Sequence, residues 1–245
     1  MSLVPLSFGA DGEPPLILVH DISGSPFAYI PFGSHPSLSQ YTIYGLSALS
    51  ESPSSTGFDY PSVHTWAESY ADLVLSELAD DLDADARVVL GGWSLGGVLA
   101  AEMARVFAER NKIRVVGLVL LDTYAPWHPR VRTGPSGSEG GSGVGIESAY
   151  FSPAEMTRIG DLLASTERAV WPGLDHTQCP AWLVTPSVAG ANGFEEWFGD
   201  LKAGRVCRIG QGKEGCDHFS MMDAEAGWIE EVIAELSDAL KEMLR

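Results

Sequence analysis

Short apolar runs alternate along the chain with longer stretches in which apolar residues recur every three or four positions. Runs that are apolar over their whole length predict strands that are buried on both faces of a sheet, which is typical of parallel strands. The pattern predicts such strands at Leu16–His20, Tyr41–Gly45, Arg87–Trp93, Arg114–Leu121, Ala181–Thr185 and Arg205–Ile209, with Leu3–Phe8 as a candidate antiparallel edge strand.

The longer stretches predict amphipathic helices. Ser62 is a suitable N-cap for a helix over Ser62–Asp80, and Asp223–Leu244 places Trp228, Val232 and Leu236 on one stripe. A third, alanine-rich helix is expected over Leu95–Glu109. Strands that alternate with helices in this way predict a doubly wound, mostly parallel α/β sheet.

One stretch, from Trp127 to about Pro180, contains no convincing strand. Its segment Arg132–Gly145 has the composition of a flexible linker, and Ser152–Ser165 has a helical pattern. Long irregular insertions in compact domains are often functional lids. We therefore expect residues 1–245 to form a single domain with a helical lid insertion at about 127–180.

A Gly-x-Ser-x-Gly motif is formed by Gly92, Ser94 and Gly96, between the predicted strand that ends at Trp93 and the helix that starts at Leu95. A serine on such a sharp strand-to-helix turn projects its hydroxyl above the sheet edge, and this context distinguishes the motif from a chance match. The first helical amides favour a developing oxyanion there. The pattern predicts Ser94 as a nucleophile, with the Leu95 amide as an oxyanion donor.

A serine nucleophile needs a histidine base that a carboxylate orients. His218 follows the last predicted strand, and so lies at the same edge of the sheet as Ser94. Asp122 ends the strand Arg114–Leu121, where a buried carboxylate costs free energy unless it is paired. We favour Asp122 as the acid over Glu195, Glu196 and Asp200, which lie one strand later, and over Asp217, the neighbour of His218. The other histidines after Ser94 are His128 and His176, which lie at the two ends of the lid region.

The loop after the first core strand should supply the second oxyanion donor. It reads His20-Asp-Ile-Ser-Gly24, and by position we choose the amide of Ile22.

Composition excludes several other classes of function. The net charge of −18 disfavours a nucleic-acid partner, because phosphate binding needs basic patches. No apolar run is long enough to span a membrane, and the start of the chain does not resemble a signal peptide. Three cysteines without paired spacing argue against a disulfide framework or a zinc site and favour the reducing cytoplasm. We expect neither a metal nor a bound cofactor.

Together these residues resemble the thioesterase domains of nonribosomal peptide synthetase and polyketide synthase assembly lines, which have the α/β-hydrolase fold. Gly92–Gly97 is similar to the family's nucleophile block, Leu118–Asp122 to its acid block and Gly215–Met222 to its histidine block. The first loop departs from the family's His-Pro-x-Gly-Gly, and this departure falls on the segment that carries Ile22.

The resemblance implies a chemical role for each of these residues. An acyl, peptidyl or polyketide chain would arrive as a thioester on the phosphopantetheine of a carrier protein and pass to Ser94 as an ester. Water or a nucleophile within the chain would then release it as an acid or a ring. Arg130 and Arg132 are candidates to meet the phosphopantetheine phosphate. Two alternatives stay open at this point: a small-ester carboxylesterase or lipase, and a non-catalytic binding module on a hydrolase scaffold.

Overall fold

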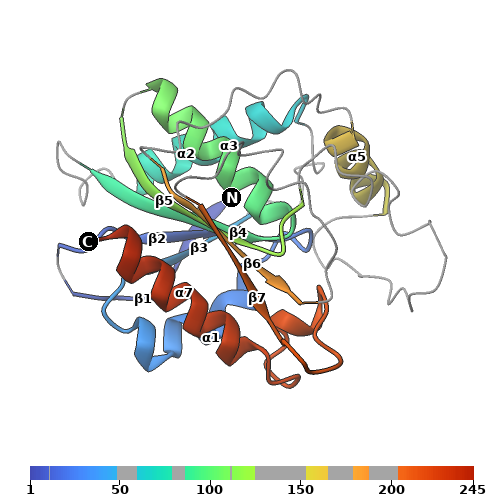
Figure 1. The fold of residues 1–245 in the computed structure, drawn as a ribbon. Coiled ribbons are helices and arrows are strands. Elements are labelled where there is room, and N and C mark those ends of the chain that lie inside the picture. Colours follow the sequence, from blue (N-terminus) through green and yellow to red (C-terminus); the bar gives the residue numbers. More distant parts are fainter. Residues whose placement is uncertain are drawn as a thin grey trace.

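Seven strands form one sheet in the order β1-β3-β2-β4-β5-β6-β7. The computed structural model describes residues 1–10, 12–48, 60–78, 86–110, 112–124, 153–164, 179–187 and 204–245. β1 runs antiparallel to β3, and every other neighbouring pair is parallel, as the sequence predicts. The strands are β1 (Ser2–Ser7), β2 (Leu16–Val19), β3 (Ile43–Ser47), β4 (Arg87–Trp93), β5 (Arg114–Leu121), β6 (Ala181–Pro186) and β7 (Gly204–Ile209), which Figure 1 shows as arrows.

The strand order reverses at β2, which lies between β3 and β4. From β2 the chain passes to β3, which lies between β2 and β1, and then returns to the other side of β2 for β4 to β7. In open α/β sheets, ligands bind outside the carboxyl ends of the strands at such a point. β2 and β4 are therefore the strands whose ends should carry a site.

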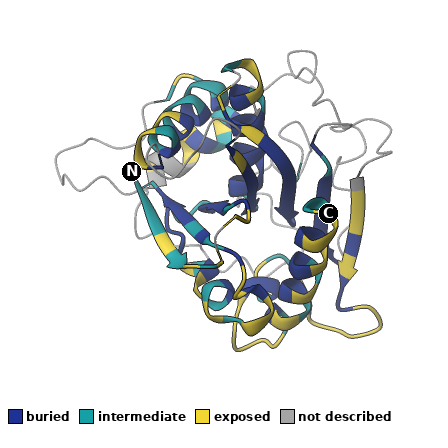
Figure 2. Cartoon of the chain, turned by 90° about the vertical axis from the view of Figure 1, so that its left-hand side faces the viewer, coloured by how far each residue is buried: buried dark blue, intermediate teal, exposed yellow. Residues whose placement is uncertain are grey.

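Helices cover both faces of the sheet, as the doubly wound prediction requires (Figure 1). Apolar side chains fill two clusters, one on each face, and Figure 2 shows the buried strands between helices whose outer sides are exposed. One cluster lies under α2 and α3, and the other under α1 and α7. The helices are α1 (Ile30–Ser34), α2 (Val63–Glu77), α3 (Leu95–Arg110), α5 (Pro153–Ala164) and α7 (Ile229–Met243), with 3-10 turns at Phe27–Tyr29, Pro36–Leu38 and Ser220–Met222.

Most helix predictions are confirmed, and the exceptions have local causes. The Ser62 hydroxyl accepts a hydrogen bond from the Thr65 amide at 3.0 Å and caps α2 as expected. The last helix starts at Ile229 rather than at Asp223, because Gly227 adopts a φ of +79° that breaks helical geometry. β3 lies about two positions later than predicted, and the turns at 27–38 were not expected.

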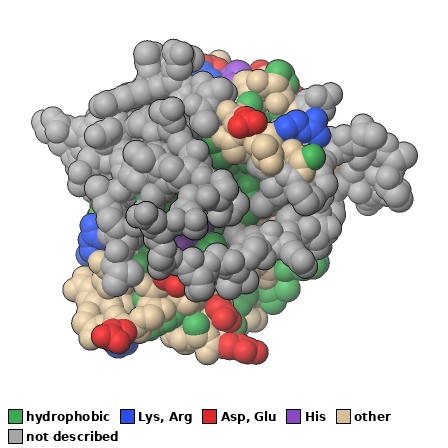
Figure 3. Space-filling model, turned by 90° about the vertical axis from the view of Figure 1, so that its right-hand side faces the viewer, with side chains coloured by type: hydrophobic (Ala, Val, Ile, Leu, Met, Phe, Trp, Pro, Cys, Tyr) green, Lys and Arg blue, Asp and Glu red, His purple; other side chains and the backbone are tan. Residues whose placement is uncertain are grey.

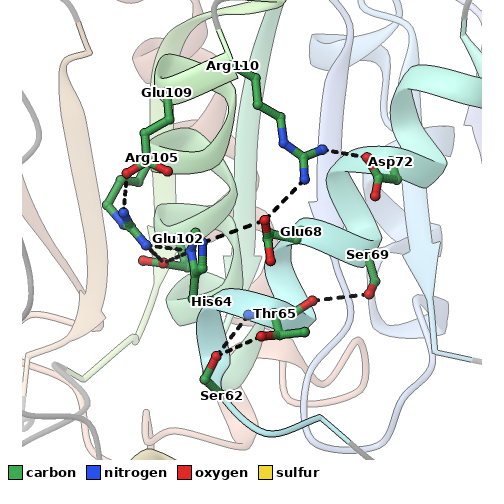
Figure 4. Close-up of polar contacts among 10 residues, drawn as sticks. All are labelled: Ser62, His64, Thr65, Glu68, Ser69, Asp72, Glu102, Arg105, Glu109 and Arg110. Carbon is green, nitrogen blue, oxygen red and sulfur yellow. Dashed lines mark hydrogen bonds and ion pairs between the residues drawn. The ribbon is translucent and has the colours of Figure 1, made fainter.

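A network of charged side chains joins α2 to α3 (Figure 4). Glu102 of α3 is 2% exposed, and its Oε1 contacts His64 Nδ1 at 2.7 Å and Arg105 Nε at 3.0 Å. Arg110 contacts Asp72 and Glu68 of α2 at 2.5 and 3.4 Å, so α3 is tied to α2 by several ion pairs. Within the described residues, the buried Glu102 Oε2 has no hydrogen-bond partner.

The expected lid falls largely outside the described residues. Within it, α5 confirms the helix predicted over Ser152–Ser165. Its Ile159 and Leu163 are buried in the apolar cluster that α2 and α3 cover. Arg130, Arg132, His128 and His176 lie outside the described residues.

Candidate active site

Ser94 lies on a strained turn between β4 and α3. Its φ of +57° is left-handed, a conformation that costs a residue with a side chain about 1–3 kcal/mol and that often marks functional sites. Its amide donates to the Leu121 carbonyl at 2.9 Å, which ties the turn to the end of β5. Ser94 itself is only half-buried although its neighbours are buried, so the serine is the part of the turn that remains accessible.

The glycines of the motif are required by close packing. A Cβ at Gly92 would meet Gly96 Cα at 2.8 Å, and one at Gly96 would meet the His20 carbonyl oxygen at 2.6 Å. A Cβ at Gly97 would meet Thr123 Cβ at 2.8 Å. The start of α3 thus lies against the ends of β2 and β5, and a larger residue would push it away.

Tyr29 fixes the same turn from the other face of the sheet. Its fully buried hydroxyl donates to the Val19 carbonyl at 2.7 Å and accepts from the Trp93 amide at 2.8 Å. The hydroxyl therefore joins the end of β2 to the residue immediately before Ser94. Burial raises the pKa of Tyr29 far above its ordinary value, so the hydroxyl stays protonated and can donate.

The predicted base and acid are in contact. His218 Nδ1 lies 2.8 Å from Asp122 Oδ2, although 96 positions separate the two residues. The other carboxylate oxygen, Asp122 Oδ1, accepts a hydrogen bond of 2.6 Å from the Thr185 hydroxyl. Asp122 is 1% exposed and its amide donates to the Val184 carbonyl at 2.7 Å. The carboxylate is thus held at both oxygens and orients one nitrogen of an imidazole whose side chain is 26% exposed.

Asp217, the other candidate acid that the structure describes, does not take this position. Asp217 Oδ1 accepts hydrogen bonds from the amides of Phe219 and Ser220, and these bonds, Ser220 first, lower the pKa of Asp217. Asp217 therefore closes the turn that carries His218. Glu195, Glu196 and Asp200 lie outside the described residues.

The base and the nucleophile are brought to the same edge but are not hydrogen-bonded. The ring of Trp93, the residue before Ser94, packs 5.1 Å from the His218 ring. Among the bonds formed by described residues there is none between the Ser94 hydroxyl and the imidazole. Such bonds are often longer in hydrolases without substrate than in the reacting complex.

The amide of Leu95, one predicted oxyanion donor, directly follows Ser94, and the other predicted donor, Ile22, lies in the loop after β2. β2 pairs with β4 so that Val19 is level with Gly92, and extending this register places the Ile22 loop beside the start of α3. In the described part of the chain, neither the Leu95 amide nor the Ile22 amide donates a hydrogen bond. Both remain available to a ligand, which an oxyanion site requires.

Asp21, in the same loop, is a site residue that the sequence reasoning did not select. Its carboxylate is held by the Ser23 amide at 3.0 Å and by the Ser23 hydroxyl. Burial raises the pKa of Asp21, while hydrogen bonds from Ser23 and attraction to His218 oppose the rise. Its position directly after a buried strand, like that of Asp122, was the signal that could have found it.

His20 is a structural residue of this edge. Its ring is fully buried and contacts the Tyr70 hydroxyl and the Asp21 carbonyl. Burial lowers the pKa of His20 to about 4, so the ring is neutral near pH 7.

The serine turn, the histidine held by a buried carboxylate and the mostly parallel sheet that carries them define the α/β-hydrolase fold. The chain belongs to the thioesterase domain family, whose model matches residues 14–170. The resemblance inferred from the motifs is thereby confirmed. No helix in the described part of the chain has the length and apolar character that crossing a membrane requires.

Several characterised proteins are similar to the chain. The probable thioesterase gloN of Glarea lozoyensis is 32% identical over 46% of this chain and 36% of its own length. Atrochrysone carboxylic acid synthase PKS4 of Calonarius odorifer is 34% identical over 48% of this chain and 6% of its length. The matches thus span well under half of these relatives.

Solved structures confirm the fold. The NocB thioesterase domain from the nocardicin cluster superposes with a TM-score of 0.64 at 21% identity, covering 99% of this chain and 98% of that one. YbtT, a type II thioesterase from the yersiniabactin pathway, superposes with a TM-score of 0.61 at 16% identity, with both chains covered completely.

Proposed function

We propose that the chain is a thioesterase that releases an acyl, peptidyl or polyketide chain from carrier-bound phosphopantetheine, by hydrolysis or cyclisation, through an ester on Ser94. The observation that carries this proposal is the Thr185–Asp122–His218 chain of hydrogen bonds at the sheet edge where Ser94 lies. Membership of the thioesterase family and similarity to proteins named as synthases and thioesterases of polyketide and peptide pathways support the substrate class.

In this mechanism His218 removes the proton from the Ser94 hydroxyl as its oxygen attacks the thioester carbonyl. The amides of Leu95 and Ile22 stabilise the oxyanion of the tetrahedral intermediate. The C–S bond then breaks and the pantetheine sulfur leaves with the proton from His218, while the acyl group stays on Ser94. Asp122 holds the ring in the tautomer that can accept the proton and stabilises the imidazolium that forms.

The second half of the reaction repeats these steps with a new nucleophile. Water, or a hydroxyl, amine or acidic C–H group of the acyl chain, gives a proton to His218 and attacks the ester carbonyl. The C–O bond to Ser94 then breaks, and the serine oxygen takes the proton back from His218. Water releases an acid and an internal nucleophile releases a ring. The lid, by admitting or excluding water, would decide between them.

The carrier protein is proposed to dock on the face that carries α5. Figure 3 shows this face, on which the described acidic side chains lie near its lower edge and in its upper part and the described basic ones are scattered. The candidate phosphate contacts Arg130 and Arg132 lie outside the described residues. Charge reversal at both positions should slow release from a carrier while leaving hydrolysis of a free pantetheine thioester unchanged.

Covalent labelling tests the nucleophile directly. A fluorophosphonate probe should label the wild-type chain and the Ser187→Ala variant, but not Ser94→Ala. Ser187 is the matched control because it follows β6 at the same edge, with its hydroxyl bonded to the Gly210 carbonyl at 3.0 Å. Labelling of Ser94→Ala at the wild-type rate would refute the assignment, and a wild-type chain that resists labelling would favour a binding module.

A pair of matched substrates tests the reaction class. Wild type should cleave an acyl pantetheine thioester with a higher kcat/KM than the corresponding oxygen ester. A preference for the oxygen ester would support a carboxylesterase instead. Mass spectrometry of the product released from an acylated carrier then separates hydrolysis from cyclisation.

A further inference from the structure

Three arginines line a cavity at the opposite edge of the sheet from the candidate active site. The cavity has a volume of about 320 Å³, and its lining is Arg87, Arg114, Val116, Pro180, Met243, Leu244 and Arg245. Arg87 and Arg114 begin β4 and β5, and Arg245 follows α7. In Figure 1 the end of α7 lies on the side of the sheet away from α5.

Arg87 and Arg114 are directly in register on neighbouring strands. Neighbouring strands are about 4.8 Å apart, so residues in register share a face and their like charges repel. Such a pair is unfavourable unless an opposite charge lies between the two guanidinium groups. The chain has 33 acidic residues against 15 basic ones, and yet no Asp or Glu side chain of the described residues lines the cavity.

The three arginines differ from most other cations of the described chain. Their side chains make no ion pair or hydrogen bond within the part of the chain that the structure describes. By contrast, carboxylates pair with Arg105, Arg110, Arg205, Lys213 and Lys241. In a strongly acidic protein, three unpaired guanidinium groups around one cavity are typical of a site for an anion.

The rest of the cavity wall is apolar. Val116 lies on β5, Pro180 precedes β6, and Met243 and Leu244 end α7. Met243 can lie against β5 because residue 117 is glycine: a Cβ there would meet Met243 Cγ at 3.0 Å. The volume is within the range of small-molecule sites, about 300–1,000 Å³, and exceeds what a bare phosphate needs.

We propose that this cavity binds a small organic phosphate, with the phosphate between Arg87, Arg114 and Arg245 and an apolar group against Val116 and Leu244. Guanidinium groups bind phosphate oxygens in a bidentate manner, which favours this head group. Seven residue steps of β4 separate Arg87 from Ser94, which is about 23 Å of extended chain. The site is therefore separate from the place where acyl transfer is proposed.

Isothermal titration calorimetry with hexyl phosphate tests the proposal. Wild type and Ser94→Ala should bind one molecule with equal affinity, because the site does not involve the nucleophile. Arg87→Gln/Arg114→Gln should bind at least 100-fold more weakly, since each charged hydrogen-bond donor lost costs about tenfold or more. The matched control is Arg158→Gln/Lys213→Gln, which removes two charges elsewhere and should bind like wild type. Equal affinity in the two double variants would overturn the proposal, as would absence of binding to wild type.

Two further measurements keep the proposal testable. Without ligand, Arg87→Gln/Arg114→Gln should be at least as stable to urea as wild type, because the repulsion between the two guanidinium groups is removed. A less stable variant would mean that the two arginines stabilise the fold instead of binding a ligand. Should that variant fail to fold, Arg245→Gln should still bind hexyl phosphate about tenfold more weakly. Inorganic phosphate should bind more weakly than hexyl phosphate, and equal binding would refute the apolar half of the site.

Discussion

Replacing Thr185 with valine should weaken both the fold and the hydrolase activity. The Thr185 hydroxyl donates to Asp122 Oδ1 at 2.6 Å, and the carboxylate that it holds is 1% exposed. Valine keeps the β-branched shape, so the change removes the hydrogen bond with little change in packing. A hydrogen bond to a buried charge contributes about 1.5–3 kcal/mol. For a chain of this size that corresponds to a fall in the melting temperature of roughly 3–12 °C.

Activity should fall because Asp122 is no longer fixed against the imidazole. If the same free energy is lost in the transition state, kcat/KM for a pantetheine thioester falls about 10- to 150-fold. Urea unfolding gives the stability, and a double-mutant cycle with Asp122→Ala gives the coupling: Thr185→Val should then have almost no further effect on kcat/KM.

Thr123→Val is the matched control for this experiment. Thr123 is as buried as Thr185 and lies next to Asp122, but its hydroxyl makes only a 3.4 Å contact with the Leu121 carbonyl. We expect a cost below about 1 kcal/mol there. A Thr185→Val variant with wild-type kcat/KM and stability would show that the second carboxylate contact does not orient the acid.

Other contacts give three more predictions. Tyr29→Phe should lower kcat more than it raises KM and cost about 2–4 kcal/mol in urea unfolding, because it leaves the Trp93 amide and the Val19 carbonyl unpaired. Glu102→Gln should lower the free energy of unfolding in urea by about 1–3 kcal/mol, because it weakens the buried pair with Arg105. Glu109→Gln is the control: the Glu109 side chain is 52% exposed, so its loss should change stability very little. Equal effects of the two substitutions would show that the buried pair does not stabilise the fold. The pKa of His20 falls from 6.5 to about 4 on folding, so the unfolded chain binds the extra proton between these values and stability falls as pH is lowered through them. Wild type should lose about 3 kcal/mol more than His20→Gln between pH 7 and pH 4, and parallel curves would contradict the burial effect.

The sequence predicts the sheet and the three reacting groups because each depends on a local pattern. β4 and β5 match their predicted bounds, since six consecutive residues of β4 and seven of β5 belong to one buried run. The contacts that hold the site could not be predicted in the same way. Thr185 reaches Asp122 only because β5 and β6 pair with Leu121 opposite Val184, and a sequence does not reveal that register. Tyr29 lies in short turns without periodicity, and the attraction between Asp21 and His218 depends on how the loops after β2 and β7 fold together.

The backbone hydrogen bonds also indicate which part of the site can adjust. The Ser94 amide bonds to Leu121 of β5, and the Asp122 amide bonds to Val184 of β6, so nucleophile and acid are fixed to successive strands. Both residues have positive φ, +57° and +37°, a strain that the sheet can sustain because these bonds hold it in place. His218 instead follows a loop in which Gly210, Gly212 and Gly215 have positive φ. Since Ser94 and Asp122 are held by the sheet, the proposed function assigns any movement that brings the imidazole to the Ser94 hydroxyl to this loop, about the bond from His218 to Asp122.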